Sequence, residues 1–341
     1  MAGPPSEDGP LAGTPRTGQA IPPARGTPRG GRPLDAIGIG AALLTCFLWG
    51  SNGVVGRIGT ADIPPWTLGA LRGWVGFLIL ALVLLWRRPR LPRSWAAWQR
   101  AAAIGFLQTG IPTGLFFWGV HRVDAGLAMV MMATHPFFVA LMLQRWPGGE
   151  RLTRGRLLAL AAGFAGVGLV AYAKSGASLE FQPVALAALL MASASWAAGT
   201  LLMRQPGPGW QDTHTLVTCQ MVFASLIMTA VAIPEWWGPV RFTPEAVFSL
   251  FYLGLFTTAV ASTLWFWTVQ RHGASRISVF VFGIPVSGVL LGAIVLGEPL
   301  PPLLFPGLLL VAVSLVLVNL PEAAWRGRGG RALAFLRQGA E

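Results

Sequence analysis

The sequence predicts an all-α polytopic membrane protein with ten transmembrane helices, arranged as a 5+5 inverted repeat. Of its 341 residues, 54% are hydrophobic and only 11% are charged, and the mean hydropathy is +0.60. Soluble domains carry about a quarter charged residues. Apolar runs of about twenty residues, long enough to cross a hydrocarbon core of roughly 30 Å, recur along the chain. Because this core offers the backbone no water, each run is expected to be a helix.

The apolar runs are separated by short segments that contain helix-breaking residues, such as Pro64-Pro65 and Pro301-Pro302. Tryptophans near the predicted ends, among them Trp86 and Trp146, are typical of membrane interfaces. The predicted spans are residues 37–56, 66–86, 99–120, 125–145, 155–173, 183–203, 213–233, 246–269, 276–296 and 302–320.

The basic residues, almost all of them arginines, lie between the spans rather than on one soluble domain. With the N-terminus inside, twenty of the 25 fall on the cytoplasmic side, four fall outside, and Arg72 lies within a span. This asymmetry predicts a multi-pass protein of the cell (inner or plasma) membrane with both termini cytoplasmic. The net charge of +12 therefore does not indicate nucleic-acid binding. Residues 1–36 are interpreted as a disordered cytoplasmic tail and residues 321–341 as a second cytoplasmic tail.

The chain contains an internal repeat. Residues 105–141 match residues 254–290 at eleven of 37 positions, at a constant offset of 149. The matches include a tryptophan, an arginine and a proline, in the pairs Trp118/Trp267, Arg122/Arg271 and Pro136/Pro285. Because five spans separate the partners, the two halves are expected to insert upside down relative to each other. Inverted repeats are typical of alternating-access carriers. A duplication without mechanistic meaning and a channel are the alternatives.

Several short motifs resemble the EamA-type branch of the drug/metabolite transporter superfamily. They are Trp49-Gly50-Ser51-Asn52, Leu71-Arg72, the mid-helix prolines, Gly149-Glu150-Arg151-Leu152 and Gly297-Glu298-Pro299-Leu300. The resemblance covers roughly residues 37–320. It implies two EamA-like units, residues 37–173 and 183–320, around a central cavity, and export or exchange of metabolites. Ser195-Trp196-Ala197-Ala198 replaces the first motif in the second half, so the cavity is expected to be chemically unequal.

None of the thirteen carboxylates lies in the middle of a predicted span. A proton-coupled exporter of cations normally needs an acid there, so transport of lipophilic cations or polyamines is disfavoured. Membrane-embedded metalloenzymes and transferases need acidic clusters or His-Glu pairs, which the sequence lacks. No cofactor, metal site or enzyme activity is therefore predicted.

Three residues in the spans are informative about a site. Arg72 lies about two turns into span 2, where it faces a polar cavity, pairs with a structural partner, or snorkels to the interface. In a cavity it would favour an anionic or carboxylate-bearing substrate. His135 either hydrogen-bonds substrate or a proton, or is a packing histidine that donates to a carbonyl freed by Pro136. Pro136 and Pro285 are expected to bend spans 4 and 9 and to act in gating.

The other candidate substrate-binding residues are polar and aromatic side chains of the spans, many of which have ordinary packing as their alternative. They are Trp49, Asn52, Thr109, Thr113, Trp118, Met132, Trp196, Thr200, Thr258, Ser262, Trp265, Ser278 and Phe282. Substrate is expected midway between the halves, in contact with spans 1, 3, 4, 6, 8 and 9.

The predicted function is that of a carrier that exports or exchanges small organic metabolites, such as amino acids and aromatic or other amphipathic solutes, by alternating access. A membrane channel, or a membrane-embedded enzyme acting on a lipid-soluble substrate, is the alternative. The expected partners are a small-molecule substrate and the lipid bilayer. Gly-xxx-Gly pairs indicate close helix contacts, either within the bundle or at a homodimer face. They are Gly69/Gly73, Gly110/Gly114 and Gly288/Gly292.

Overall fold

A computed structural model describes most of the chain. The described residues are 35–145, 154–175, 182–203, 210, 213–272, 280–281 and 283–319. Within these ranges the regular secondary structure is entirely helical. Eight helical segments are long and apolar enough to cross a membrane, and two shorter apolar helices, Gly283–Leu296 and Leu304–Ser314, follow them. The all-α membrane class is confirmed, whereas ten crossings additionally require both short helices to cross. The predicted tails lie outside the described residues, except that Asp35 is described and Ala36 is the first residue of a helix.

The helices follow the predicted spans closely along most of the chain. In chain order they are α1 (Ala36–Gly50), α2 (Asn52–Gly59), α3 (Pro65–Arg87), α4 (Trp95–Ile104), the π-helix η1 (Gly105–Gly110), α5 (Ile111–Val120), α6 (Ala125–Met132), α7 (His135–Leu143), α8 (Arg154–Ser175), α9 (Pro183–Met203), α10 (Thr213–Ala232), the 3-10 helix η2 (Ile233–Trp237), α11 (Pro244–Tyr252), the π-helix η3 (Leu253–Val260), α12 (Ala261–His272), α14 (Gly283–Leu296) and α15 (Leu304–Asn319). At predicted span 9, residues 276–279 and 282 lie outside the described part of the chain, and α14 is described from Gly283.

Local sequence signals explain several helix starts. The side chains of Ser94 and Thr243 accept hydrogen bonds from backbone N–H groups in the first turns of α4 and α11. Asp35 does the same for α1, with 2.7 Å between its Oδ1 and the N of Gly38. Pro65 begins α3, a position at which the missing N–H costs nothing. These caps satisfy backbone donors that would otherwise lack partners.

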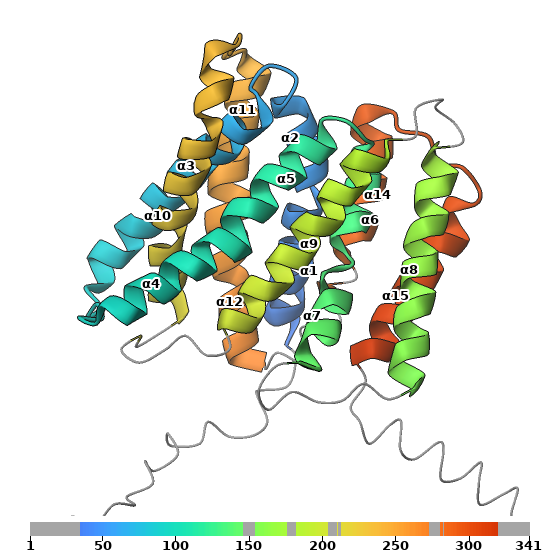
Figure 1. Ribbon diagram of the computed structural model, residues 1–341, viewed down its shortest axis with the longest axis horizontal. Coiled ribbons are helices and arrows are strands. Elements are labelled where there is room, and N and C mark those ends of the chain that lie inside the picture. Colours follow the sequence, from blue (N-terminus) through green and yellow to red (C-terminus); the bar gives the residue numbers. More distant parts are fainter. Residues whose placement is uncertain are drawn as a thin grey trace, which may run out of the picture.

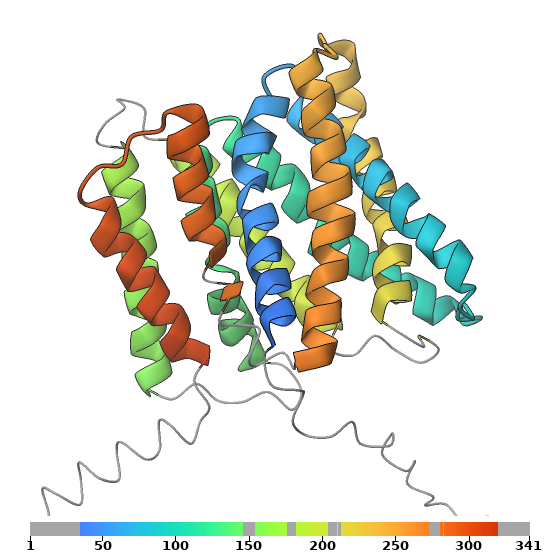
Figure 2. The ribbon, with the colours of Figure 1, turned by 180° about the vertical axis from the view of Figure 1, so that it is seen from behind.

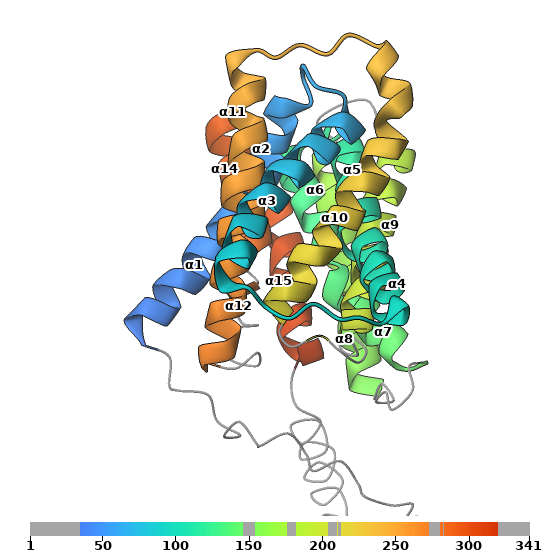
Figure 3. The ribbon, with the colours of Figure 1, turned by 90° about the vertical axis from the view of Figure 1, so that its left-hand side faces the viewer.

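The helices form one bundle. The start of α1 and the end of α15 lie at the same end of this bundle (Figures 1 and 2). At one side of the bundle α10 packs along α3, and at the other side α15 packs along α8 (Figure 1). Figure 3 views the bundle from the side of α3 and α10. Most of the remaining helices lie between these two pairs, whereas α4 begins at the outer edge on the side of α3 (Figure 1).

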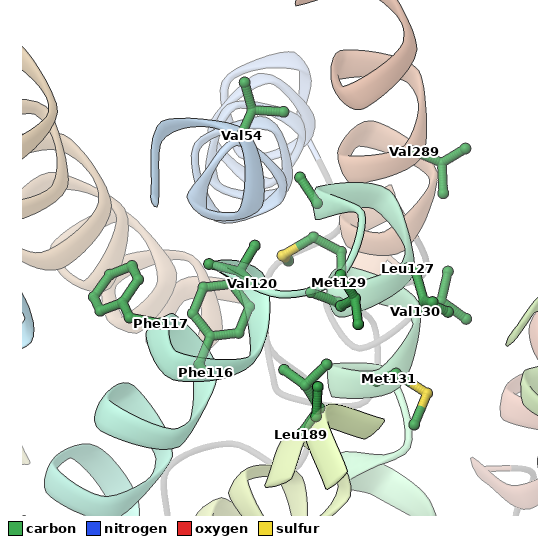
Figure 4. Close-up of a cluster of buried hydrophobic side chains, with 14 of the residues drawn as sticks. Val54, Phe116, Phe117, Val120, Leu127, Met129, Val130, Met131, Leu189 and Val289 are labelled. Atoms are coloured by element: carbon green, nitrogen blue, oxygen red, sulfur yellow. The ribbon is translucent and has the colours of Figure 1, made fainter. Parts of the chain in front are cut away.

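The main hydrophobic core lies where α2, α5, α6, α9 and α14 meet (Figure 4). Phe117, Val130 and Leu189 in it are completely buried. In a membrane such packing stabilises the bundle chiefly through van der Waals contact. The core therefore extends along the centre of the bundle, from the start of α6 to Phe137 of α7 and Leu160 of α8.

The Gly-xxx-Gly pairs lie at contacts between helices of this chain. A Cβ atom at Gly73 would lie 2.7 Å from the Oγ of Ser225 on α10. A Cβ at Gly114 would overlap the ring of Trp66, and one at Gly288 would meet the carbonyl oxygen of Gly50 at 3.3 Å. The pairs thus let helices approach within the bundle, which is one of the two uses that the sequence left open.

Candidate functional site

Span 4 is interrupted immediately before Pro136. α6 ends at Met132 and α7 begins at His135. Because proline has no N–H, the carbonyl of Met132 lacks its helical partner. Ser193 Oγ of α9 donates to this carbonyl at 3.3 Å, and Thr134 Oγ1 lies 2.9 Å from Ser193 Oγ. The break predicted at Pro136 is present, and the freed carbonyl has a polar neighbour. Its gating role stays a prediction.

Pro285 has a different setting. It lies in the first turn of α14, not in the middle of a described helix, because α14 begins at Gly283. Residue 282, where a bend before Pro285 would fall, is outside the described residues. Span 1 contains a break that sequence reasoning missed: α1 ends at Gly50 and α2 begins at Asn52. Ser51, between them, donates its hydroxyl to the carbonyl of Leu48 at 2.7 Å.

Spans 3 and 8 each contain a π-helix, and η1 and η3 overlap when the chain is shifted by the repeat offset of 149. π-helices break the regular i→i−4 pattern and are frequent at functional sites. In η3 the carbonyl of Thr257 accepts a hydrogen bond from Trp49 Nε1 at 3.1 Å. In η1 the carbonyl of Leu107 accepts one from Ser195 Oγ at 2.8 Å. Trp49 and Ser195 begin the corresponding motifs of the two halves.

Arg72 is held inside the bundle. Its Nη1 donates to Asn52 Oδ1 at 3.2 Å, and its Cζ lies 5.3 Å from the ring centroid of Phe117. These contacts favour the cavity or pairing interpretation over snorkelling. A small cavity adjoins Arg72, with a volume of about 10 Å³, room for about one water molecule. Its lining consists of Gly69, Arg72, Gly73, Thr109, Thr113, Met221, Ala224, Ser225, Met228 and Thr258.

The structure therefore brings together five predicted site residues, because Asn52 binds Arg72 while Arg72, Thr109, Thr113 and Thr258 line the cavity. The sequence predicts a substrate site formed by spans 1, 3, 4, 6, 8 and 9, and only some of these spans line this cavity. This cavity is lined by α3, η1, α5, α10 and η3, which belong to spans 2, 3, 7 and 8. Spans 2 and 7 reach it because the Gly69/Gly73 pair lets α10 approach α3 closely.

His135, Trp196 and Thr200 form a second cluster. The rings of His135 and Trp196 have centroids 4.1 Å apart, and His135 Nε2 lies 3.1 Å from Thr200 Oγ1. Since the Thr200 hydroxyl already donates to the carbonyl of Trp196 at 2.9 Å, Nε2 of His135 is the donor in this contact. His135 does not bind the carbonyl freed by Pro136, because Ser193 does so instead.

The remaining candidates do not join either cluster. Trp49 and Trp265 stack on each other with ring centroids 5.3 Å apart. Trp118 lies under Arg122 at the end of α5, with the Arg122 Cζ 3.8 Å from its ring centroid, away from the cavity. Met132 and Ser262 are half-buried. Ser278 and Phe282 lie outside the residues that the structure describes.

Sequence reasoning missed the contribution of α10. Ser225 is 1% exposed, and its Oγ has no hydrogen-bond partner in the described part of the chain. Gln220, also buried, makes contacts of 3.2 Å with Thr109 Oγ1. The available signal was the Gly69/Gly73 pair, which required a helix close to α3 but did not identify it.

Carboxylates close one end of the bundle. Glu298, which follows α14, accepts hydrogen bonds from the N–H groups of Ala125 and Gly126 at the start of α6. Lys174 Nζ at the end of α8 lies 3.4 Å from Glu298 and 3.2 Å from Asp124, and its side chain is 1% exposed. The contact between a carboxylate and a helix N-terminus is favourable because of the free N–H groups and the helix dipole. These side chains tie spans 4, 5 and 9 together.

The other carboxylates in the described part of the chain also lie at helix ends. Glu235 in η2 accepts a 2.8 Å bond from the N–H of Thr67 and so caps α3. At the opposite end of the bundle, Asp35 binds Arg271 at 2.8 Å. The hydrogen bond from Gly38, together with Arg271, lowers the pKa of Asp35. Among the described residues, the expectation that no acid lies mid-span therefore holds.

Comparison with known proteins identifies a family. The model of the EamA-like transporter family matches residues 36–172 and 183–320. The uncharacterized transporter YvbV of Bacillus subtilis is 29% identical over 83% of this chain and 92% of its own length. The uncharacterized inner membrane transporter YedA of Escherichia coli is 26% identical over 82% of this chain and 90% of its own. A probable amino-acid metabolite efflux pump of E. coli is 27% identical over 84% and 95%. A solved crystal structure with 17% identity superposes with a TM-score of 0.58 over 83% of this chain and 96% of that chain, which shows a shared fold.

Proposed function

Since the chain belongs to the EamA-like transporter family and is a multi-pass membrane transporter, we propose that it is an alternating-access carrier of small organic metabolites. It crosses the cell membrane ten times, as two five-helix units of opposite orientation, with residues 37–173 and 183–320 as the units. Both termini face the cytoplasm. Amino acids, aromatic acids and other amphipathic solutes are the candidate substrates.

The observation that carries this proposal is the reciprocal contact between the two halves. Trp49 of span 1 donates to a carbonyl of η3 in span 8, and Ser195 of span 6 donates to a carbonyl of η1 in span 3. The two closest side-by-side pairs, α3 with α10 and α8 with α15, also join spans at the same position in each half. Such exchange symmetry is what a carrier needs to convert one open state into the other.

The bundle is closed at the end where Glu298 caps α6. There Lys174 contacts Asp124 and Glu298, and the core residues Val54, Ala125 and Val289 are buried. A transport cycle has to separate α14 from α6 at this end and to close the opposite end. The proposed orientation puts the Glu298 end outside, because the arginine-rich end then faces the cytoplasm.

The proposed substrate class is supported by one relative. One E. coli relative is named as a probable amino-acid metabolite efflux pump, and the similarity extends over most of both chains. Export is accordingly the direction we propose. The mostly neutral side chains that line the cavity, hydroxyl-bearing and apolar together, suit solutes of mixed polarity.

Counterflow tests the proposal. The purified protein is screened by thermal shift against amino acids, nucleosides, sugars and aromatic acids, and each hit is then measured in proteoliposomes. A carrier accumulates labelled solute when unlabelled solute is loaded inside, whereas a channel shows no such trans-stimulation. Flux without trans-stimulation, or chemical conversion of the solute, would contradict the carrier proposal. Empty liposomes are the control.

A further inference from the structure

Arg72 has a positive charge without a carboxylate partner among the described residues. Its contacts within the described part of the chain are the neutral amide oxygen of Asn52 and the ring of Phe117. The amide uses one of the five N–H donors that a guanidinium carries. The ion pairs among the described residues lie at the ends of helices, as at Lys174 and Asp35.

An isolated cation inside a membrane bundle is costly. Charged side chains within spans almost always pair with another charge or line a pathway for ions or substrates. An arginine that served only to hold Asn52 could be replaced by a neutral donor at lower cost. The missing negative charge is therefore expected to arrive from outside the chain.

The cavity beside Arg72 has a second polar group that lacks a partner. Ser225 is 1% exposed, its Oγ has no hydrogen-bond partner among the described residues, and it lines the same cavity as Arg72. A buried hydroxyl without a partner is destabilising. Glycines at positions 69 and 73 keep the facing surface of α3 free of side chains. An arginine fork and a free hydroxyl together suit a carboxylate, which accepts several hydrogen bonds.

We propose that Arg72 and Ser225 form the subsite that binds the carboxylate of the transported solute, so that the protein selects organic acids and amino acids over the matching amines. This inference rests on the proposed carrier function. The cavity has room for only about one water molecule in this conformation. The carboxylate therefore enters when α10 and α3 move apart.

The selectivity is tested with matched solutes in proteoliposomes. The panel consists of phenylalanine, tryptophan and phenylacetate, each with its amide, and the amines phenylethylamine and tryptamine. We expect the wild-type protein to prefer acids over amides and amines at least about tenfold in apparent affinity, as for a charge-assisted hydrogen bond. Equal affinity of acids and amides would overturn the carboxylate subsite while leaving the carrier function intact. If no solute in the panel or in the wider screen shows counterflow, the carrier function itself fails.

Variants assign the selectivity to these residues. Arg72→Gln should remove the preference for acids while changing the affinity for amides less than about twofold, and Arg72→Lys should keep part of the preference, as a point charge does. Ser225→Ala should lower acid affinity by about three- to tenfold. Arg241→Gln, at an exposed arginine, is the matched control and should behave as the wild type. If Arg72→Gln does not fold, Arg72→Lys and Ser225→Ala decide. An unchanged acid-to-amide ratio in all variants that fold would overturn the proposal.

Discussion

Glu298 connects three helices through a single carboxylate. Glu298 follows the end of α14, and its carboxylate accepts hydrogen bonds from the first N–H groups of α6. Its Oε2 lies 3.4 Å from the Nζ of Lys174 in α8. Its carboxylate is nearly buried, with 7% of the side chain exposed. Loss of its charge leaves Lys174 with Asp124 alone. The closed end of the bundle is therefore expected to depend on this residue.

Glu298→Gln should weaken the closed end. The amide keeps one acceptor for α6 but loses the ionic contact, at a cost of about 1–3 kcal/mol. In a protein without Cys46 and Cys219, a cysteine placed at Val54, which is 3% exposed near this end, should react with a maleimide at least about fivefold faster in the variant. Glu245→Gln, at an exposed glutamate of α11, is the matched control. Equal labelling rates in both variants would show that Glu298 does not hold this end closed.

At the residue scale, the sequence drew attention to a side chain where the cost of its position could be read from the chain itself. Arg72 was identified because an arginine inside a span needs a reason, although its partner Asn52 could not be assigned without the fold. Ser225 was missed because a serine in a membrane helix is ordinary, and only the facing glycines of α3 make its hydroxyl notable. His135 was identified, but its partner was not, since Thr200 lies 65 positions away.

At the scale of the element, the interruption of span 4 is compensated by a second helix. Ser193 of α9 donates to the carbonyl that Pro136 leaves without a partner. Proline made this break predictable, and Pro112 likewise follows η1, whereas the break at Ser51 and the π-helix η3 have no proline beside them. The π-helices make contacts with the other half of the chain, such as the hydrogen bond from Trp49 to the carbonyl of Thr257. The hydrophobic periodicity of a single span carries no information about such contacts.

Pro136→Ala combined with Pro285→Ala should slow transport without preventing membrane insertion. An alanine at 136 restores an N–H that can bond to the carbonyl of Met132, so α6 and α7 can join into one stiffer helix. We expect an about threefold to tenfold lower rate of counterflow, which corresponds to roughly 0.7–1.4 kcal/mol in the barrier. Affinity in the thermal-shift assay should be unchanged. Wild-type transport rates in the double variant would show that transport does not depend on these two prolines.

At the scale of the whole molecule, alternating access requires that the two ends of the bundle are never open together. Val54 reports on the end closed by Glu298, and Thr200, half-buried near the end of α9, reports on the other side of the bundle. The sequence supported this two-ended arrangement through the repeat offset and the arginine distribution. It could not indicate which end is closed, because that depends on contacts between helices distant in sequence.

The two single-cysteine proteins, Val54→Cys and Thr200→Cys, should label from opposite sides of the membrane and in opposite directions. In right-side-out vesicles, a membrane-impermeant maleimide should reach the cysteine at 54 only from outside and the one at 200 only from inside. A transported solute that drives the cycle should raise the rate at 54 and lower it at 200. A cysteine at the exposed Arg241 should label from outside at a constant rate. A pore would label at both sites from either side whatever the solute, and labelling at 54 from inside alone would reverse the proposed orientation.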